Sequence, residues 1–467
     1  MRHRLSAVVA VALLAGPGLA ELPAQSVPAG FFRTHRDRFL ARLPPNSIAV
    51  FRNPAEDDRA ASTDPYRSDS DFWYLTGYPE ADAVAVFRPN APDGKRYVLF
   101  VPPKGFAEEQ WTGYRAGVEG AVKDYGANDA QPIADLWSRL PALASGATSL
   151  HYGDGEDRKF REQLLSAWGA RGTDAATSRP MADAGPLVHQ LRLVKDETEQ
   201  ALLRRAAGLT AEAHRAAMAL VRPGRGENAI KAAMVSHCLE GGAARMAYPP
   251  IIGSGRNSVI LHYDVDDRPL EGGAMIVNDT ACEFGMYAAD VTRSYPVSGR
   301  FSPEQRAIYA IVLEAQKAAM AAVKPGTPIR DVHAASVDVV VDGLLRLGIL
   351  SGDRAEILKS RSYQKLYPHG CSHWLGLDVH DAGSYGYPEG LDRKERYGKA
   401  MTRLEPGMAL TVEPGIYVPE DPTVDRRWWN IGVRLEDDLL VTATGGECLS
   451  CSAPREIGDV EKAIAGR

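Results

Sequence analysis

The sequence predicts an α+β protein in which a curved antiparallel sheet forms a larger C-terminal domain and a smaller α/β domain precedes it. In the first part of the chain, short apolar runs alternate with helical segments, which is typical of α/β folds. In the second part, helical patterns and strand-like runs follow a mixed order that favours antiparallel pairing over a long parallel winding. The 467 residues are enough for two or three domains, each with its own core.

The first residues have the three-part layout of a secretory signal. Arg2 and Arg4 precede an apolar run at 7–15, and small residues follow as far as Ala24. The apolar run is too short to span a bilayer stably. We therefore expect residues 1–25 to be a signal peptide and the mature protein to be exported, either periplasmic or secreted. No stable membrane span is expected after cleavage.

Residues 26–186 are predicted to form the α/β domain. Its strand signals are the apolar runs SIAVF (47–51), DAVAVF (82–87) and RYVLFVP (96–102), which turn-rich stretches separate. Residues 129–144, DAQPIADLWSRLPALA, are predicted to be helical.

Residues 187–467 are predicted to form the second domain. Asp196 followed three residues later by Glu199 resembles a capping box, and apolar residues then recur at helical spacing. Further helices are expected after Ser302, a candidate N-cap, and at 329–350. The strand-like runs of this domain are AMIVNDTACEF (274–284), YAADVTRSYPV (287–297), MALTVEPGIYV (408–418) and IGVRLEDDLLVT (431–442).

Charge and cysteine content limit the possible partners. The formal net charge of -6 argues against nucleic acid, which normally requires a basic surface. The chain has five cysteines, so at least one thiol is free. Cys448 and Cys451 form a C-x-x-C without the second pair or the histidines of a structural zinc site. They are either a local disulfide or two small core residues, and we favour the second interpretation.

Three of the eleven histidines lie in HGCSHWLGLDVHD, residues 369–381. A buried histidine often does no more than donate to a backbone carbonyl, so the cluster alone does not define a site. The apolar residues between His373 and His380 predict a turn that leads into a buried strand with polar groups at its ends.

Four acidic residues interrupt the strand-like runs of the second domain: Asp279, Asp290, Glu413 and Glu436. An ionised carboxylate is costly to bury unless it is paired or bound to a metal. Four carboxylates and one imidazole would suit two divalent cations, and this donor set favours Mn²⁺, Co²⁺ or Zn²⁺. Such a metal pair activates a water molecule and polarises a carbonyl group, so hydrolysis of an amide is the predicted chemistry.

The order and spacing of five motifs resemble those of the pita-bread metallopeptidases, family M24B. The motifs are ILHY (260–263), DTACEFGMYAADVTR (279–293), the histidine segment, TVEPGIY (411–417) and GVRLEDD (432–438). The resemblance is greatest to the Xaa-Pro aminopeptidases (aminopeptidase P) and is close to the prolidases. SDSDFWYLTGYPEADAVAVF (68–87) is similar to the N-terminal domain of both groups, so the resemblance covers nearly all of the chain after the signal.

This resemblance implies a role for each site residue. The metal ligands would be Asp279, Asp290, His373, Glu413 and Glu436, with Asp290 and Glu436 bridging two divalent ions, of which Mn²⁺ is expected first. Glu413 would also be the base, His380 would stabilise the oxyanion and His262 would help to transfer protons. His369 would line the proline pocket, and Tyr417 and Arg434 would contact the carboxylates or the substrate.

The implied activity is hydrolysis of the bond between an N-terminal residue and a following proline in peptide substrates, by a homodimer or homotetramer. A prolidase, which cuts only dipeptides, is the first alternative, because GYPEG (386–390) and LSCSAPREI (449–457) are prolidase-like. Prolidases hold the dipeptide carboxylate with an arginine, and four basic residues crowd the corresponding region here: Arg393, Arg396, Lys399 and Arg403. A non-catalytic binding protein is the second alternative, although an unused cluster of buried carboxylates would have nothing to offset its burial cost.

Overall fold

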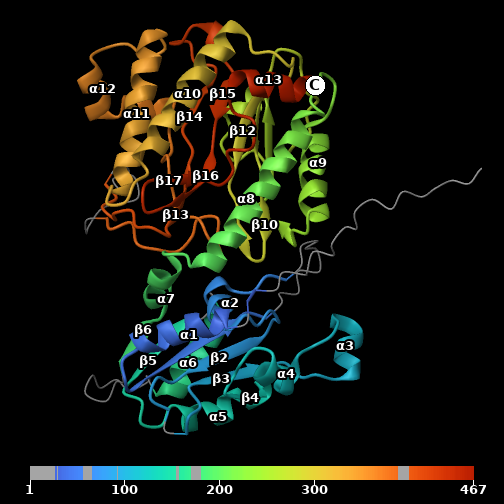
Figure 1. Cartoon of the computed structure of the whole chain (residues 1–467), viewed down its shortest axis with the longest axis vertical. Coiled ribbons are helices and arrows are strands. Elements are labelled where there is room, and N and C mark those ends of the chain that lie inside the picture. Colours follow the sequence, from blue (N-terminus) through green and yellow to red (C-terminus); the bar gives the residue numbers. More distant parts are fainter. Residues whose placement is uncertain are drawn as a thin grey trace, which may run out of the picture.

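The computed structural model describes residues 27–28, 30–55, 66–91, 93–153, 157–169, 180–387 and 399–466. The predicted signal peptide, Arg393 and Arg396 lie outside these residues. Figure 1 shows two domains, one above the other, with helix α7 (Gly185–Arg192) lying between them. Within the described ranges, no helix is both long enough and apolar enough to cross a membrane.

A mixed six-stranded sheet organises the N-terminal domain, with the strand order β4-β3-β2-β1-β5-β6. Strand β2 pairs antiparallel with β1 and β3, whereas the pairs β1–β5, β3–β4 and β5–β6 are parallel. The elements are α1 (Phe31–Arg42), β1 (Ser47–Asn53), α2 (Ser70–Thr76), β2 (Ala83–Phe87), β3 (Tyr97–Val101), α3 (Phe106–Thr112), α4 (Gly117–Lys123), β4 (Asp129–Pro132), α5 (Leu136–Leu143), β5 (Ser149–Gly153), α6 (Arg158–Trp168) and β6 (Met181–Asp183).

Strands β2 and β3 of this sheet are apolar along their whole length because both of their faces are covered. Alternate residues point to opposite faces of a strand. Ala49, Phe51 and Leu99 join the core with α1 and α2, whereas Val50 and Phe100 join a separate core with α5 and α6. The three predicted strands are confirmed. The helix predicted at 129–144 is wrong at its start, since 129–132 pairs with β3 as strand β4 before α5 begins.

The C-terminal domain contains four short antiparallel sheets between two pairs of long helices (Figure 1). Helices α8 and α9 pack together on one side, and α10 and α11 on the other. The elements are α8 (Glu197–Met218), α9 (Glu227–Glu240), β7 (Arg245–Met246), β8 (Ile251–Ser254), β9 (Met275–Asp279), β10 (Cys282–Phe284), β11 (Tyr287–Ala288), β12 (Thr292–Pro296), α10 (Pro303–Ala322), α11 (Ile329–Arg346), α12 (Arg354–Ser360), β13 (Ala409–Val412), β14 (Gly415–Val418), β15 (Ile431–Arg434), β16 (Asp437–Val441), β17 (Gly446–Cys448) and α13 (Ile457–Ala465).

The sequence signals of this domain are largely confirmed. Asp196 and Ser302 cap α8 and α10, each in a complete capping box with Glu199 or Gln305. Each of the four strand-like runs divides into two strands, and all strand pairs of the domain are antiparallel. The break within each run falls at or beside one of the four acidic residues.

The strand predicted within residues 369–381 is wrong. The segment forms only an isolated bridge, between Trp374 and Leu410. Its backbone forms hydrogen bonds to β13, for example from the Leu375 N–H to the Ala409 carbonyl. The segment then turns back on itself, and the Asp381 N–H donates to the Trp374 carbonyl. The apolar residues of this segment are therefore buried in a tight loop, which periodicity cannot distinguish from a strand.

Two disulfides are present among the described cysteines. Cys238 of α9 is bonded to Cys282 of β10, a pairing the sequence did not indicate, and Cys371 is free and buried, as the odd count required. Cys448 is bonded to Cys451. Our preference for two small core residues there was wrong: both are partly exposed, and the turn after β17 brings their Cα atoms to 5.6 Å, a separation that a disulfide spans readily.

Candidate active site

Each of the four acidic residues stands at the end of a strand or in the short break between two strands of the C-terminal domain. Asp279 ends β9 and lies opposite Thr292 of β12, so that Asp290, two residues before Thr292, is close to it. Glu413 separates β13 from β14, and Glu436 separates β15 from β16. Antiparallel pairing of these strands brings residues distant in sequence to one place.

His373 lies at the centre of this carboxylate group. Its Nε2 is 3.3 Å from Asp290 Oδ2, 3.7 Å from Glu413 Oε1 and 4.0 Å from Glu436 Oε1. The ligand atoms of His373, Asp290 and Glu436 all lie within 4.8 Å of one another, which is compatible with a shared metal ion. His373 Nδ1 donates to the Trp374 carbonyl at 3.0 Å, and this bond leaves Nε2 facing the carboxylates.

Two further side chains hold Asp279. The Tyr248 hydroxyl lies 2.5 Å from Asp279 Oδ1 and 2.8 Å from Asp290 Oδ1, so it joins the two aspartates. Arg434 Nη2 donates to the other oxygen, Asp279 Oδ2, at 2.5 Å. Burial and the charge of Asp279 raise the pKa of Tyr248 well above its ordinary value, which keeps the phenol protonated as a donor.

Arg434 also connects the carboxylates to the predicted proline pocket. Its Nη1 donates to the Tyr417 hydroxyl at 2.8 Å, and that hydroxyl lies 2.9 Å from His369 Nε2. His369 Nδ1 lies 3.5 Å from Glu413 Oε2. The hydrogen-bonded side chains of Arg434, Tyr417 and His369 therefore form one wall of the site, beside Glu413.

The two remaining predicted residues lie at the open side of the group. The ring of His380 is 4.2 Å from that of His373, measured between centroids, and His380 is exposed. His262 is also exposed, in the loop after the 3₁₀ turn at Gly255–Val259, and it is close enough to His369 to be among the groups that act on the pKa of that residue, which burial lowers to about 3. All ten predicted site residues are thus brought to one region of the C-terminal domain.

The site concentrates negative charge in a buried environment. Burial raises the pKa of Glu413 to about 8, and the charges of Asp290 and Asp279 add to this against the opposing effect of His373. Burial and the charges of Asp290 and Glu413 likewise raise the pKa of Glu436 well above its usual range. Burial would lower the pKa of His373, but its bond to Asp290 and the nearby carboxylates raise it to about 9. The raised pKa values of both glutamates and of His373 indicate that the carboxylates outnumber the positive charges around them.

The donor set fits divalent metal ions. The side chains of Asp279, Asp290, Glu413 and Glu436 offer carboxylate oxygens, and His373 offers an imidazole nitrogen already oriented toward them. Arg434 supplies one positive charge beside four carboxylates, so divalent cations bound to the ionised carboxylates and the neutral His373 imidazole would complete the charge balance. The residues present therefore fit a metal centre of the kind that the sequence predicted.

Several supporting residues were not found from the sequence. Tyr248 comes from a turn-rich stretch, RMAYPP, that no periodicity marks. The Thr292 hydroxyl donates to Glu436 Oε2 at 2.7 Å, and Asp438 accepts the N–H of Asp290. His214 of α8 shares its Nε2–H between the Thr280 and Val291 carbonyls, which ties together the strands that carry the aspartates. All four act through contacts that only the tertiary structure creates.

Two family models match the chain. Metallopeptidase family M24 matches residues 201–443, and the aminopeptidase P N-terminal domain matches residues 32–151. Among curated proteins, the Xaa-Pro aminopeptidase of Haemophilus influenzae is 37% identical over 444 residues, which cover 95% of this chain and 98% of the relative. The Xaa-Pro aminopeptidase of Escherichia coli is 36% identical over 435 residues, 92% of this chain and 96% of the relative.

Solved structures are similar over the same extent. Aminopeptidase PepP of Pseudomonas aeruginosa superposes with a TM-score of 0.87 at 39% identity and covers 94% of this chain and 98% of its own. Aminopeptidase P of Escherichia coli with the inhibitor Pro-Leu gives the same TM-score at 35% identity, covering 94% of this chain and 99% of its own.

The fold, the carboxylate and histidine site and these matches define the class: the chain belongs to metallopeptidase family M24, with its pita-bread fold and an aminopeptidase P N-terminal domain. Within that family it is a metallo-aminopeptidase of the Xaa-Pro aminopeptidase group. The predicted family and enzyme class are confirmed, and the prolidase and non-catalytic alternatives are not supported.

Proposed function

We propose that residues 187–467 hydrolyse the peptide bond between an N-terminal residue and a following proline, in peptides longer than two residues. The observation that carries this proposal is the group of four carboxylates around His373, backed by Arg434 and walled by Tyr417 and His369. Support also comes from relatives named Xaa-Pro aminopeptidase over almost the whole chain.

The residues would divide the work of hydrolysis. Asp279, Asp290, His373, Glu413 and Glu436 would hold two divalent ions, which when bound supply a water molecule of lowered pKa and polarise the scissile carbonyl. Glu413 would take the proton of the attacking water and deliver it to the proline nitrogen, because this carboxylate lies beside His369 as well as His373. His380 would donate to the oxyanion, and His262 would help to move protons at the open side.

Selection for proline follows from the chemistry of the bond. An amide to proline has no N–H, so peptidases that depend on that donor handle it badly. His369, half-buried and held by Tyr417, offers a wall for the ring instead of a hydrogen-bond acceptor for a backbone N–H. The acidic group nearby would receive the free α-amino group of the substrate.

Hydrolysis of Ala-Pro-Ala and of Ala-Pro by metal-stripped protein, with and without added Mn²⁺, tests this function. We expect metal-dependent release of alanine from the tripeptide. Cleavage of the dipeptide alone would replace the proposal with a prolidase. Cleavage of neither by metal-loaded protein would show that the substrate class is wrong.

We propose Mn²⁺ as the metal, with Co²⁺ and Zn²⁺ as substitutes. Oxygen ligands outnumber the nitrogen ligand by four residues to one, and no cysteine thiol belongs to the predicted set, which suits a hard cation. Elemental analysis of protein purified without chelators would test this. A predominance of a thiophilic metal such as copper would contradict it.

We propose that the protein is exported, with residues 1–25 as a cleaved signal. The two disulfides support an oxidising compartment, because such bonds persist there and are rare in the cytosol of most organisms. Fractionation of cells that produce the full chain, followed by N-terminal sequencing, tests this. Recovery of uncleaved protein in the cytosolic fraction would contradict it.

We propose that the protein is a homo-oligomer, a dimer or a tetramer, that associates through its N-terminal domain. Helix α3 stands at the edge of that domain (Figure 1). Phe106 and Trp111 of this helix and Tyr114, two residues after its end, are each at least 85% accessible. Three exposed large apolar side chains within nine residues of sequence are typical of a contact surface. Light scattering of the protein and of Trp111→Glu tests this, and a monomeric unmodified protein would contradict it.

A further inference from the structure

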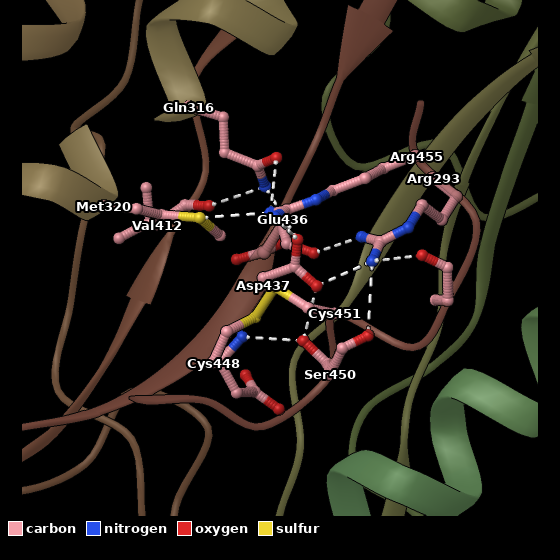
Figure 2. The surroundings of a disulfide bond; sticks show 12 residues. Arg293, Gln316, Met320, Val412, Glu436, Asp437, Cys448, Ser450, Cys451 and Arg455 are labelled. Carbon is pink, nitrogen blue, oxygen red and sulfur yellow. Dashed lines mark hydrogen bonds and ion pairs between the residues drawn. A yellow bond between two sulfur atoms is a disulfide. The ribbon is translucent and has the colours of Figure 1, made fainter. Parts of the chain in front are cut away.

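The Cys448–Cys451 disulfide lies next to the polar network that supports the metal-ligand strands. The bond closes a ring of four consecutive residues, and Ser450 lies inside that ring with no exposed surface (Figure 2). The Ser450 hydroxyl donates to Asp437 Oδ1 at 2.6 Å and accepts the Asp438 N–H at 3.0 Å. The disulfide ring therefore holds the residues that directly follow Glu436.

From this ring, one path of contacts leads to Asp290. The Asp438 carboxylate accepts the Asp290 N–H, at 3.1 Å and 3.2 Å from its two oxygens. Because the Asp438 N–H is fixed by Ser450, the position of the Asp290 backbone depends on the ring. Both aspartates are buried, so a shift of one displaces the other.

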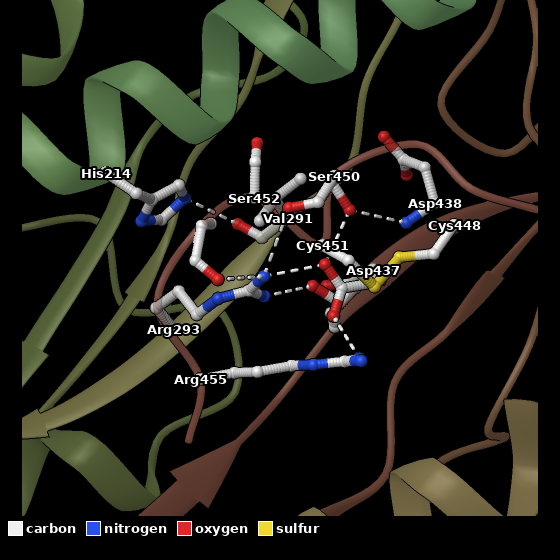
Figure 3. A network of polar contacts seen from close by, with 12 residues as sticks. His214, Val291, Arg293, Asp437, Asp438, Cys448, Ser450, Cys451, Ser452 and Arg455 are labelled. Atoms are coloured by element: carbon white, nitrogen blue, oxygen red, sulfur yellow. Dashed lines mark hydrogen bonds and ion pairs between the residues drawn. A yellow bond between two sulfur atoms is a disulfide. The ribbon is translucent and has the colours of Figure 1, made fainter. Parts of the chain in front are cut away.

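A second path leads to Glu436 through Arg293, which is completely buried (Figure 3). Arg293 Nη2 donates to Asp437 Oδ1 at 2.6 Å and also contacts the Ser450 and Ala453 carbonyls at 3.4 Å and 3.3 Å. Its Nη1 donates to the Glu436 carbonyl at 2.6 Å. One guanidinium thus joins the disulfide loop to the backbone of a predicted metal ligand.

The two cysteines of this bond lie at the surface of the domain. Both sulfurs belong to partly exposed residues, and Cys451 lines a surface cavity of about 510 Å³. Three basic residues, Arg215, Arg455 and Lys462, line the same cavity together with two acidic ones, Glu456 and Asp459, so the lining has an excess of one positive charge, which favours approach of a thiolate. By contrast, Cys238 and Cys282 have no exposed surface.

We infer that Cys448–Cys451 is a thiol-exchange site at which a dithiol reductant weakens metal binding. A thiolate of the dithiol attacks Sγ of Cys451, the bond between the two cysteines breaks, and Cys448 leaves as a thiolate that takes a proton from water. The second thiolate of the dithiol then displaces Cys451 from the mixed disulfide. The reductant ends as a disulfide, and both cysteines end as thiols after the transfer of two electrons.

Reduction acts locally because the ring is small. A bond between residues three positions apart removes little entropy from the unfolded chain, so its loss costs less stability than loss of the bond that spans 44 positions. What is lost is the constraint on Ser450, and with it the fixed positions of Asp437 and Asp438. Groups that orient metal ligands in this way commonly change metal affinity by about 10- to 100-fold.

The first test asks which cysteines a reductant reaches in the folded, metal-loaded protein. The protein is treated with dithiothreitol, the free thiols are alkylated and the peptides are identified by mass spectrometry. We expect labels on Cys448 and Cys451 while Cys238 and Cys282 stay bonded. Absence of label at Cys448 and Cys451 would overturn the proposal.

The second test measures Mn²⁺ affinity by calorimetry, which needs no substrate. The inference rests on the metal ligands proposed above, so the oxidised protein must first bind Mn²⁺; failure to bind would overturn the ligand assignment, and the inference with it. The double variant Cys448→Ser/Cys451→Ser should bind Mn²⁺ about tenfold more weakly with little change in its unfolding temperature. Unchanged affinity would overturn the role of the disulfide.

A pair of single variants separates the network from the cysteines themselves. Ser450→Ala removes the hydroxyl between Asp437 and Asp438 and should weaken Mn²⁺ binding about tenfold, with or without reductant. Ser452→Ala, two positions away and exposed, is the matched control and should bind Mn²⁺ as the unmodified protein does. Equal affinity of the two variants would contradict the proposed path.

Discussion

At the scale of single residues, the site is defined by buried charge that its neighbours only partly compensate. Asp290 and Glu436 are almost fully buried. Asp290 accepts a hydrogen bond from the Tyr248 hydroxyl, and Glu436 accepts one from the Thr292 hydroxyl. Such carboxylates persist in a protein interior when they are paired or bind a cation. The consequences of removing one charge or one donor are therefore specific.

Replacement of Asp290 by asparagine should lower Mn²⁺ affinity and Ala-Pro-Ala hydrolysis by about 100-fold or more, because the neutral amide removes one of the four negative charges. Calorimetry and a peptide assay measure the two effects. Asp124→Asn, at an exposed position in the N-terminal domain, is the control. Retention of both properties in Asp290→Asn would show that Asp290 is not a ligand.

Replacement of His380 by alanine should lower kcat by about 100-fold and change KM little, because an oxyanion donor acts mainly in the transition state. The ring contact with His373 places His380 beside the carboxylate group without making it part of that group. Steady-state kinetics on Ala-Pro-Ala provide the measurement. A change confined to KM would assign His380 to ground-state binding instead.

At the scale of elements, helix caps fix where the long helices begin and therefore what they cover. Helix α10 begins at a complete capping box, and further along it Gln316 donates to Asp437 Oδ2 at 3.0 Å, within the network behind Glu436. The helix start at Ser302, a local sequence signal, thus helps to place Gln316, which supports the network behind Glu436.

Ser302→Ala should lower the free energy of unfolding by about 1 kcal/mol, because the Gln305 N–H loses its side-chain acceptor. Chemical denaturation of the metal-free protein measures this loss. Ser351→Ala, at an exposed position outside any helix, should change stability by less than about 0.5 kcal/mol. Equal stability of both variants would mean that the box contributes nothing.

At the scale of the whole molecule, the two domains are joined beside the site. A shared hydrophobic cluster includes Trp73 and Tyr287, one from each domain. Asp381, next to His380, forms ion pairs with Arg192 of α7 and with Lys195, the latter at 2.9 Å, and all three are buried. Arg192 also pairs with Asp71 of α2 at 2.7 Å, so the position of the histidine segment depends on how the N-terminal domain packs.

Asp381→Asn should destabilise the protein by about 3 kcal/mol, because it removes the carboxylate that pairs with buried Lys195 and one of those that pair with buried Arg192. Asp378 also pairs with Arg192 but is 41% exposed, so Asp378→Asn is a matched control with an expected loss below about 1 kcal/mol. Thermal and denaturant unfolding measure both. Similar losses in the two variants would contradict the importance of burial.

The same ion pairs predict a pH dependence. Burial would raise the pKa of Asp381, but Lys195 and Arg192 lower it to about 2, below its value of about 3.9 in an unfolded chain. The stabilisation is therefore complete above about pH 4 and is lost as the pH falls toward 2. Unfolding curves over this range should show a smaller decline for Asp381→Asn than for the unmodified protein. Parallel declines would refute the assignment.

The sequence by itself determined the fold class, the helix starts at Asp196 and Ser302, the central strands and the four acidic residues of the site, because caps, alternation and acidic residues in apolar runs are local signals. The motifs shared with the family added the other six residues that gather there. The sequence did not determine the partners of Cys238, the role of Tyr248 or the loop at 369–381. Those depend on which distant segments meet: Tyr248 matters because β9 and β12 bring Asp279 and Asp290 together, and Cys238 because α9 packs against β10. Periodicity reports how buried a residue is, whereas only tertiary packing decides which atoms it touches.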